Sequence, residues 1–471
     1  MTGGLLVVGV DLDGARVDVR AAGGVVTEVA DGLVPRRGET VLRGSAALLP
    51  GLHDHHLHLL AMAARDRSVD LGPGSVNGAA DLRRVLRSAD AALPPGAWIR
   101  AVGHHERTGG RLDRWVLDAV VADRPVRVQH RSGHLWVVNS AGWRALVAGG
   151  PGAGPDGVER DDRGEPTGRL FDADRWVADR LPRGADPDLG AVSRRLASYG
   201  VTGVTDATPT RSVTELEALA GARRSGAVVQ RVRVMGRVPP DGPGVPDELE
   251  VGPVKVMVPD GRGADVDDLA DAVAAAHRSG RAVALHCVSR VAAVLALAAW
   301  DAAGARPGDR MEHGAVLPPD LVDRLARLGV TVVTQPAFVG ERGDDYVEDV
   351  EPDDLPHLYP CARLDRAGVA LGAGTDAPFG PEDPWVAIGS AVDRRTGSGR
   401  VLGPDERLSP SRALALFLSD PTAPGGPVRR VRVGGPADLC LLGDGLDATL
   451  SDPGSRRVVA TVVDGTVVHE G

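Results

Sequence analysis

The sequence predicts an α/β protein: a (β/α)8 TIM barrel with a small β-sandwich built from both termini and a long insertion after barrel strand 1. Three observations support this prediction. Apolar β-type runs alternate with helix-like segments eight times along the middle of the chain, which is the pattern of a parallel barrel. Short strands broken by Asp-Gly and Gly-Gly turns occupy both ends. The interval from about residue 59 to residue 199 is far too long for one crossover connection.

Short strands at the two ends of the chain predict one shared β domain. They are Leu5–Val8, Val17–Ala21, Val25–Val29 and Thr40–Leu42 near the N-terminus, and Asp438–Leu442, Val458–Val463 and Val467–His469 near the C-terminus. Asp464-Gly465, between the last two runs, is a hairpin signal. We therefore expect residues 1–48 and 425–471 to form the two parts of a β-sandwich.

Eight apolar runs between these ends predict the strands of a barrel that spans residues 49–424. They are Leu48–Asp54, Gly200–Asp206, Val228–Gly236, Val254–Val258, Ala282–His286, Asp309–His313, Val330–Gln335 and Val369–Asp376. Helix-like segments such as Val266–Ser279 and Pro319–Leu328 separate most of them. The long interval after the first strand predicts an inserted subdomain at about residues 63–195, which opens with a helix at Ala79–Leu93.

The composition excludes several classes of partner. The net charge is −10 and the arginines are interleaved with acidic residues, which argues against nucleic acid. No run approaches the roughly 18 apolar residues of a membrane helix. The cysteines Cys287, Cys361 and Cys440 are widely separated and predict reduced thiols in the cytoplasm. We expect a cytoplasmic protein with a small-molecule substrate, either as a monomer or as a homo-oligomer.

The segment Pro50–His58 carries the strongest chemical signal in the chain. Side chains of a strand alternate between its faces, so Asp54, His56 and His58 point to the same side. Two imidazoles two residues apart can hold one metal ion, and a carboxylate behind them can orient one ring. The preceding apolar run predicts that they lie at the carboxyl end of a strand, where barrel enzymes keep their chemistry. The alternative is a surface histidine cluster.

Lys255 is the only lysine in the 471 residues, and it lies inside the apolar run Val254–Val258. An unpaired cation is expensive to bury. A lysine amine, unlike a guanidinium, can lose its proton when buried and then react with carbon dioxide to give a carbamate. A carbamylated lysine is a carboxylate on a long arm and can bridge two metal ions. The alternative is an ammonium group that pairs with a buried acid or reaches the strand end.

Three later predicted strands also end in residues that bind metals. Strand five ends at His286, strand six at His313 and strand eight at Asp376. Each residue alone is more simply explained, the histidines as buried core residues and Asp376 as a turn former before Ala377-Pro378. Together, however, five predicted strand ends carry His-x-His, Lys, His, His and Asp in barrel order. That set is hard to explain by chance.

With these motifs the chain resembles the amidohydrolase superfamily of metal-dependent hydrolases, and in particular its branch of N-substituted formamide deformylases. The resemblance covers nearly the whole chain. The motifs that carry it are Pro50-Gly51-Leu52 leading into Asp54-x-His56-x-His58, Val254-Lys255 followed by Asp260-Gly261, His286, Met311–Gly314, Gln335-Pro336, Gly374–Pro378 and Gly434–Leu439. In the insertion, His130–His134, Asn139-Ser140 and Gly164–Gly168 resemble the branch's substrate-facing segments.

The resemblance implies a set of ligands and a cofactor. The metal ligands would be His56, His58, His286, His313 and Asp376, with Lys255 as a carbamylated bridge. The cofactor would be one or two divalent ions per chain, with zinc as the expected metal. Asp376 would also be the catalytic residue that contacts the bound water. His134 in the insertion is a candidate substrate contact, and the alternative is a structural histidine packed beside Trp136.

This site predicts an amidohydrolase that acts on a carbon–nitrogen bond other than a peptide bond (EC 3.5 type), in an amide, an N-substituted formamide or a related group. A bound metal lowers the pKa of water from about 15.7 toward ~7, and Asp376 would take the proton during attack and return it to the departing nitrogen. Three alternatives stay open. They are deamination of a nitrogen heterocycle at a mononuclear site, a lyase or isomerase reaction on the same barrel, and a non-catalytic binding protein.

Overall fold

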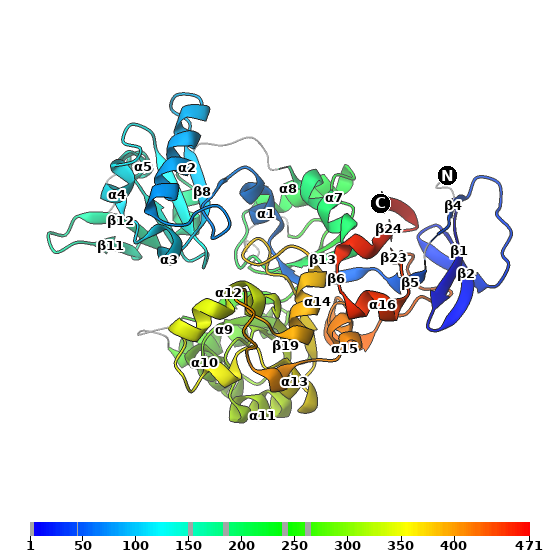
Figure 1. The fold of residues 1–471 in the computed structure, drawn as a ribbon. Helices are drawn as coiled ribbons and strands as arrows, with labels where there is room; N and C mark the ends of the chain where they lie inside the picture. The colour runs from blue at the N-terminus through cyan, green and yellow to red at the C-terminus, as the bar shows by residue number, and fades with distance from the viewer. Residues whose placement is uncertain (1–3, 45, 149–153, 182–187, 238–243, 260–264) are drawn as a thin grey trace. The chain divides into compact units, whose positions relative to one another are not determined.

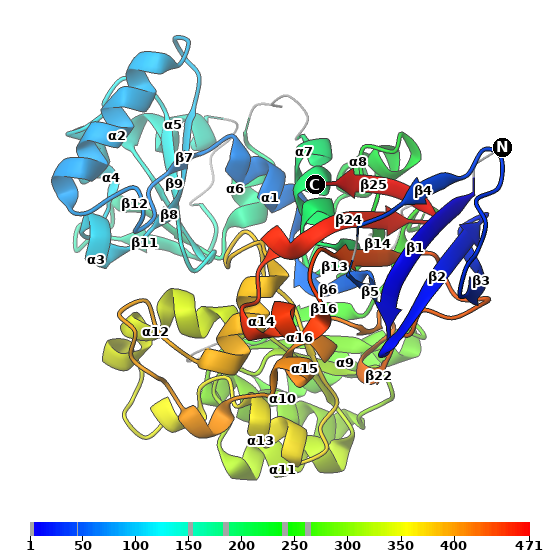
Figure 2. The same ribbon diagram turned by 45° about the vertical axis from the view of Figure 1, so that its right-hand side comes forward.

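The computed structural model describes residues 4–44, 46–148, 154–181, 188–237, 244–259 and 265–471. The chain divides into two compact units, which are described separately. The first unit comprises Met1–Leu59 and Leu189–Gly471, and the second comprises Leu60–Asp188. Both are mixed α/β structures (Figures 1 and 2).

Strands from both ends of the chain form one eight-stranded sheet in the first unit, and blue and red strands accordingly lie together in Figure 2. The strands are β1 (Leu5–Leu12), β2 (Ala15–Ala22), β3 (Val25–Ala30), β4 (Thr40–Leu42), β5 (Ala47–Pro50), β23 (Leu439–Leu442), β24 (Val458–Val463) and β25 (Thr466–Glu470). Their order is β25-β24-β23-β5-β1-β2-β3, with β4 beside β1. The predicted hairpin is confirmed: β24 and β25 pair around Asp464-Gly465, where both residues have positive φ. Apolar side chains from both ends, among them Leu5, Val19, Leu441 and Val462, share one core.

The predicted single strand Leu48–Asp54 is wrong, because the chain forms two strands there. Ala47–Pro50 (β5) pairs with β1 and β23 in the terminal sheet, whereas Leu52–Leu57 (β6) pairs with β13 in a parallel sheet. Gly51 lies between them, and a Cβ there would be 2.1 Å from Thr202 Cγ2, so the close approach requires glycine. The apolar run is continuous in the sequence, and its pattern does not mark the change of sheet.

Two parallel sheets carry the strand ends on which the chemical motifs lie. Their orders are β15-β14-β13-β6 and β16-β17-β18-β19-β20. The strands are β6 (Leu52–Leu57), β13 (Val201–Asp206), β14 (Arg231–Val234), β15 (Glu250–Val251), β16 (Val254–Met257), β17 (Val283–Cys287), β18 (Arg310–His313), β19 (Thr331–Thr334) and β20 (Leu371–Ala373). Each of the other predicted middle strands overlaps one of these. Backbone hydrogen bonds from Asp376 N to His56 O (2.7 Å) and from His58 N to Ala377 O (2.8 Å) place the end of β6 beside the segment that follows β20.

Helices follow most of the parallel strands. In the first unit they are α7 (Leu189–Ser198), α8 (Val213–Arg224), α9 (Val266–Arg278), α10 (Arg290–Ala303), α11 (Pro319–Leu328), α12 (Ala337–Asp349), α13 (Cys361–Arg366), α14 (Pro384–Asp393), α15 (Pro410–Ala415) and α16 (Leu446–Ser451), and the short strands β21 (Ser419–Asp420) and β22 (Ala423–Val428) pair after α15. Ser212 and Glu215 form a capping box at the start of α8. α11 has its predicted bounds, with Pro319 in the first turn and a left-handed Gly329 after the last.

The second unit is built on a six-stranded mixed sheet with the order β11-β12-β10-β9-β8-β7. Its strands are β7 (Val69–Asp70), β8 (Ile99–His104), β9 (Val126–His130), β10 (Leu135–Val138), β11 (Val158–Arg160) and β12 (Pro166–Phe171), and α1 (Leu59–Asp66) leads into α2 (Ala79–Ala92), α3 (Glu106–Gly109), α4 (Arg114–Asp118), α5 (Ser140–Val147) and α6 (Asp174–Ala178). Leu82 and Leu86 of α2 pack with strand residues such as Ile99 and Val128. Within the described ranges, no helix of either unit is long and apolar enough to cross a membrane.

Candidate metal centre

Two histidines and a carboxylate converge where the end of β6 meets the segment after β20. His58 Nε2 lies 3.2 Å from Asp376 Oδ1, and His56 Nε2 lies 3.5 Å from the same oxygen. One ligand atom from each of these three residues lies within 4.8 Å of the others. His56 and Asp376 are buried, and His58 is partly exposed. The cluster therefore has the dimensions and the chemistry of a site for a divalent metal ion.

Close packing around Asp54 and Gly374 holds these ligands in place. Asp54 accepts hydrogen bonds from Thr375 Oγ1 (2.6 Å), Thr375 N (3.1 Å) and His56 N (3.0 Å). Burial raises the pKa of Asp54 to about 7, although the hydrogen bonds from Thr375 act in the opposite direction. A Cβ on Gly374 would lie 2.5 Å from His56 N, so only glycine allows this approach. Asp54 thus connects the two segments that carry the ligands.

Glu312 orients His56, and the sequence analysis gave Glu312 no role. Its Oε2 contacts His56 Nδ1, and its Oε1 accepts a hydrogen bond from Arg310 Nε in a buried pair. Arg310 Nη2 also donates to His55 O at 2.9 Å. A carboxylate at Nδ1 holds the ring proton there and leaves the Nε2 lone pair for a metal. Glu312 directly precedes His313 in the sequence, but only the contact in the structure assigns it to His56.

His313 and His286 lie beside His56, and Lys255 is buried near them. The ring centroids of His56 and His313 are 4.9 Å apart, and those of His313 and His286 are 4.4 Å apart. Lys255 is 3% exposed, and in the part of the chain that the structure describes its Nζ has no hydrogen-bond partner. Burial lowers the pKa of Lys255 to about 8, against the attraction of nearby carboxylates. A buried amine without a hydrogen-bond partner is costly. The position of Lys255 Nζ therefore indicates that a further group binds at the site.

Burial also sets the charges of the ligands. It lowers the pKa of both His56 and His313 well below 6.5. Burial alone would raise the pKa of Asp376, but the hydrogen bond with His58 and the surrounding basic groups bring it below 3.8. Buried imidazoles are therefore neutral and Asp376 is ionised at neutral pH, which is the state that metal ligands require. Imidazole nitrogens and a carboxylate oxygen are a donor set that zinc and similar ions accept, so these residues fit a divalent metal.

The predicted substrate contact, His134, belongs to the second unit. Its Nδ1 lies 2.7 Å from Asp172 Oδ1, and 43% of its side chain is exposed. Trp136 Nε1 donates a hydrogen bond to a different carboxylate, Asp174 Oδ1, at 2.8 Å. These contacts are all within the second unit, so a role of His134 in substrate binding stays a prediction. The motif residues Asp260-Gly261 lie outside the described residues.

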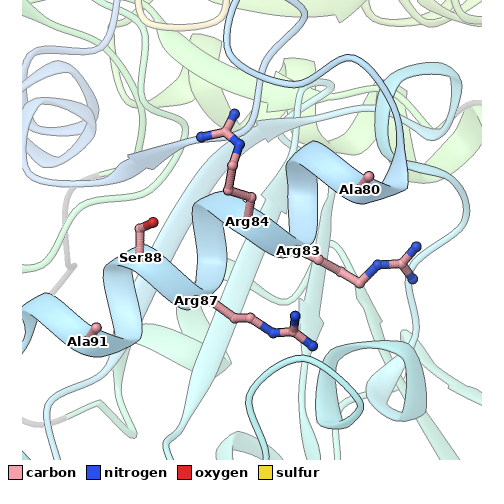
Figure 3. A pocket seen from close by; sticks show the side chains of 6 residues that line it. All are labelled: Ala80, Arg83, Arg84, Arg87, Ser88 and Ala91. Atoms are coloured by element: carbon pink, nitrogen blue, oxygen red, sulfur yellow. The ribbon is translucent and has the colours of Figure 1, made fainter.

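A hollow of about 550 Å³ lies on the exposed face of α2 in the second unit (Figure 3). Its lining residues all come from this one helix: Ala80, Arg83, Arg84, Arg87, Ser88 and Ala91. The three arginine side chains extend in different directions in Figure 3 and do not converge on one point. The hollow contains none of the predicted metal ligands, so we interpret it as a solvated helix face and not as a substrate pocket.

The fold and the cluster define a class: an α/β protein with histidine and aspartate side chains that could hold a metal ion at the ends of parallel strands. Residues 44–469 match the model of the amidohydrolase family, so the chain belongs to this family, as its strand-end motifs predicted. It is 26% identical over 522 residues to the N-substituted formamide deformylase of Arthrobacter pascens, covering 96% of each chain.

Two solved structures share the fold of this chain. One is an uncharacterized metal-dependent hydrolase from Pyrococcus horikoshii, with a TM-score of 0.72, 21% identity, and coverage of 94% of this chain and 97% of that chain. The other is an uncharacterized metal-dependent hydrolase from Pyrococcus furiosus, with a TM-score of 0.69, 21% identity, and coverage of 94% of this chain and 99% of that chain. At these identities the likeness describes the fold alone.

Proposed function

We propose that this protein is a metal-dependent hydrolase that cleaves a carbon–nitrogen bond in a small molecule. The convergence of His56, His58 and Asp376 at strand ends, in a chain of the amidohydrolase family, carries this proposal. The scissile bond would belong to an amide, an N-substituted formamide or a related group, because the relative from Arthrobacter pascens is an N-substituted formamide deformylase. The reaction would fall among hydrolases of carbon–nitrogen bonds other than peptide bonds.

The two parallel sheets would form one (β/α)8 barrel. Its strands would be β6, β13, β14, β16, β17, β18, β19 and β20. The hydrogen bonds between the end of β6 and the segment after β20 support this closure. A barrel would bring the carboxyl ends of all these strands, with their predicted ligands, to one face. The corresponding domains are a barrel at residues 49–424 with an insertion at about 63–195, and a β-sandwich from residues 1–48 and 425–471.

The metal site would use every ligand that the sequence predicted. His56, His58, His286, His313 and Asp376 would hold one or two divalent ions, with zinc as the first candidate. Lys255 would carry a carbamate that bridges two ions. Its lowered pKa supports this role, because only the neutral amine reacts with carbon dioxide. The buried Nζ would then find partners that the described residues do not supply.

The chain's own residues would direct the proton transfers. When bound, the metal would supply Lewis acidity and lower the pKa of water toward neutrality. Asp376 would accept the proton of the attacking water, because its carboxylate is ionised at neutral pH. It would then deliver this proton to the departing nitrogen. Glu312 would hold His56 in the required tautomer, and His134 would contact the substrate.

The test combines metal analysis with a substrate screen. We expect one or two zinc, manganese or iron atoms per chain, and hydrolysis of amides or N-substituted formamides in the presence of the metal. Formate or carboxylate products formed in ¹⁸O-labelled water should contain one oxygen from the solvent. The variant Asp376→Asn should keep its metal and lose most turnover. Unchanged turnover in this variant would remove Asp376 from the mechanism.

Other outcomes of the same screen would favour the alternatives. Ammonia release from nitrogen heterocycles with one metal per chain would identify a deaminase. Turnover without incorporation of solvent oxygen would identify a lyase or an isomerase. Absence of metal after reconstitution with zinc would overturn the proposal and leave a binding protein.

A further inference from the structure

A second cluster of histidines lies in the second unit, at the carboxyl ends of two neighbouring strands. β8 and β9 are parallel, and their last residues, His104 and His130, are partners in the register. His105 follows β8 directly and is the N-cap of α3, where its Nδ1 accepts a hydrogen bond from Arg107 N. Glu106 begins α3. The local fold thus brings three consecutive residues from one strand end next to the end of another strand.

Donor atoms of three of these residues converge. One ligand atom from each of His105, Glu106 and His130 lies within 4.8 Å of the others. His130 Nε2 is 2.9 Å from Glu106 Oε2, and its Nδ1 is 2.8 Å from Ser132 Oγ. The rings of His105 and His130 have centroids 5.4 Å apart. A metal ion placed between these three donor atoms could therefore bind all of them after small side-chain movements.

His104 is the independent sign of a ligand at this cluster. It is 1% exposed, and within the described ranges neither ring nitrogen has a hydrogen-bond partner. Its ring centroid lies 6.2 Å from that of His130. Leaving both nitrogens of a buried imidazole without partners is costly, and native proteins rarely do so. The donor atoms of His104 are not among those that lie within 4.8 Å of one another, so its ring would move toward the cluster for a metal ion to give one of these nitrogens a partner.

The charges around the cluster are compatible with a cation. Arg169 Nη1 lies 3.7 Å from Glu106 Oε1, and Arg169 Nε lies 3.4 Å from Glu159 Oε2. The other oxygen of Glu106, Oε2, faces His130. Burial lowers the pKa of His104 to about 4 and also lowers the pKa of His130. Both rings are therefore neutral near pH 7, as a ligand must be.

We propose that His105, Glu106 and His130 form a second metal site, specific for zinc or a similar borderline divalent ion, with His104 as the fourth ligand. Two or three imidazoles with one glutamate are a ligand set that suits zinc, whereas magnesium and calcium prefer oxygen atoms only. The site shares no residue with the cluster of His56, His58 and Asp376. The proposal therefore stands independently of the proposed hydrolase activity.

Metal binding requires a change of tautomer at His130 and a small movement of Ser132. In the hydrogen-bonded state Nε2–H donates to Glu106 Oε2. In the metal-bound state the proton would occupy Nδ1 and be donated to Ser132 Oγ, which lies 2.8 Å away. Ser132 N–H now donates to the same Nδ1 at 3.1 Å and would have to turn away from it. Nε2 and Oε2 would then each take a coordinate bond of about 2.0–2.2 Å to the ion. Ser132 would serve as the partner that orients a ligating histidine.

The experiment measures zinc binding by the full chain after removal of all metal with a chelator. The first variant changes His56, His58, His286 and His313 to asparagine and so removes all four histidines of the candidate metal centre. Zinc that this variant still binds reports on the second cluster. We expect this variant to bind one zinc ion per chain. Adding His105→Gln and His130→Gln should weaken that binding at least tenfold. The matched control, His357→Gln with His469→Gln, removes two histidines outside both clusters and should leave zinc binding unchanged.

Cobalt supplies a second readout. Co²⁺ bound to the first variant should give the visible absorption of a four-coordinate site, and adding His104→Gln should change this spectrum. In the otherwise unaltered chain, His105→Gln with His130→Gln should lower the zinc content at saturation by one ion per chain. This measurement replaces the first one if the first variant does not fold. Equal zinc affinity with and without His105 and His130, or no zinc bound in the first variant, would overturn the proposal.

Discussion

The contact between Glu312 and His56 predicts that Glu312→Gln weakens metal binding without removing any ligand. Glutamine keeps the volume of the side chain but replaces one carboxylate oxygen with an NH₂ group. If the amide oxygen faces His56, the NH₂ group faces Arg310 Nε–H, and two donors oppose each other. If the NH₂ group faces His56 Nδ1, it stabilises the tautomer with the proton on Nε2, which cannot bind a metal.

The expected magnitude follows from the burial of the pair. Glu312 is 0% exposed and Arg310 is 2% exposed. Removing one partner of a buried ion pair destabilises a protein by about 3–5 kcal/mol. The retained amide oxygen and the hydrogen bond from Arg310 to His55 O should hold the loss near the lower limit, about 3 kcal/mol. Loss of the group that orients a metal-binding histidine should weaken metal affinity by about 10–100-fold.

The assay measures zinc affinity by competition with a chelator and the free energy of unfolding by denaturant titration. Asp309→Asn is the matched control, because Asp309 is equally buried, precedes the same strand, and bonds to His277 Nε2 (3.0 Å) and Trp300 Nε1 (3.1 Å) away from the ligands. We expect Asp309→Asn to lose stability with unchanged zinc affinity, and Glu312→Gln to lose both. Zinc affinity within twofold of the parent in Glu312→Gln would refute the orienting role of Glu312.

Four further predictions concern three residues of the same site. Asp376→Asn should retain the metal content of the parent and lose most turnover, as measured by elemental analysis beside a hydrolysis assay; turnover equal to the parent would contradict the assigned role. Lys255→Ala should lower metal content, with partial rescue by a short carboxylic acid, and full activity of Lys255→Arg would exclude the carbamate. Because the pKa of Lys255 is lowered to about 8, its neutral fraction rises as the pH increases through that value. At constant carbon dioxide, metal uptake by the apoprotein should therefore accelerate from pH 7 to pH 9, and a flat profile would speak against carbamylation. Gly374→Ala would place a Cβ 2.6 Å from His56 Cβ. This variant should lose about 1–3 kcal/mol of stability and should also bind less metal. Gly389→Ala, which meets nothing within 4 Å, is its control, and equal effects of the two would refute the packing argument.

The strand ends could be predicted from the sequence because their signal is local. Several middle strands are short apolar runs that end in a residue of a type that binds metals, as in Val283–His286. A run of this kind specifies its own end, and parallel strands bring such ends to one edge. The helices were predictable for the same reason, since Pro319 and Gly329 mark the first and last turns of α11 within the sequence itself.

The partners of the ligands could not be predicted, because they depend on contacts between distant segments. Glu312 and His56 are 256 residues apart, and strand alternation alone does not reveal which neighbouring side chain a buried carboxylate meets. The cluster of His105, Glu106 and His130 escaped prediction similarly. His104 and His130 become neighbours only through the pairing of β8 with β9, and the sequence offers no ligand spacing between them.

Backbone conformation explains why two of the predicted ligands depart from simple strand alternation. His313 and Asp376 both have positive φ, 69° and 54°. This left-handed conformation is uncommon for residues with a Cβ, although aspartate, asparagine and histidine adopt it more often than others. A residue in this conformation no longer follows the pleat, so its side chain is directed by the turn and not by its parity in the strand. Strain of this kind persists where surrounding contacts enforce it, here the hydrogen bond from Asp376 N to His56 O. The same backbone bond that holds the unusual φ of Asp376 also keeps its carboxylate beside His56.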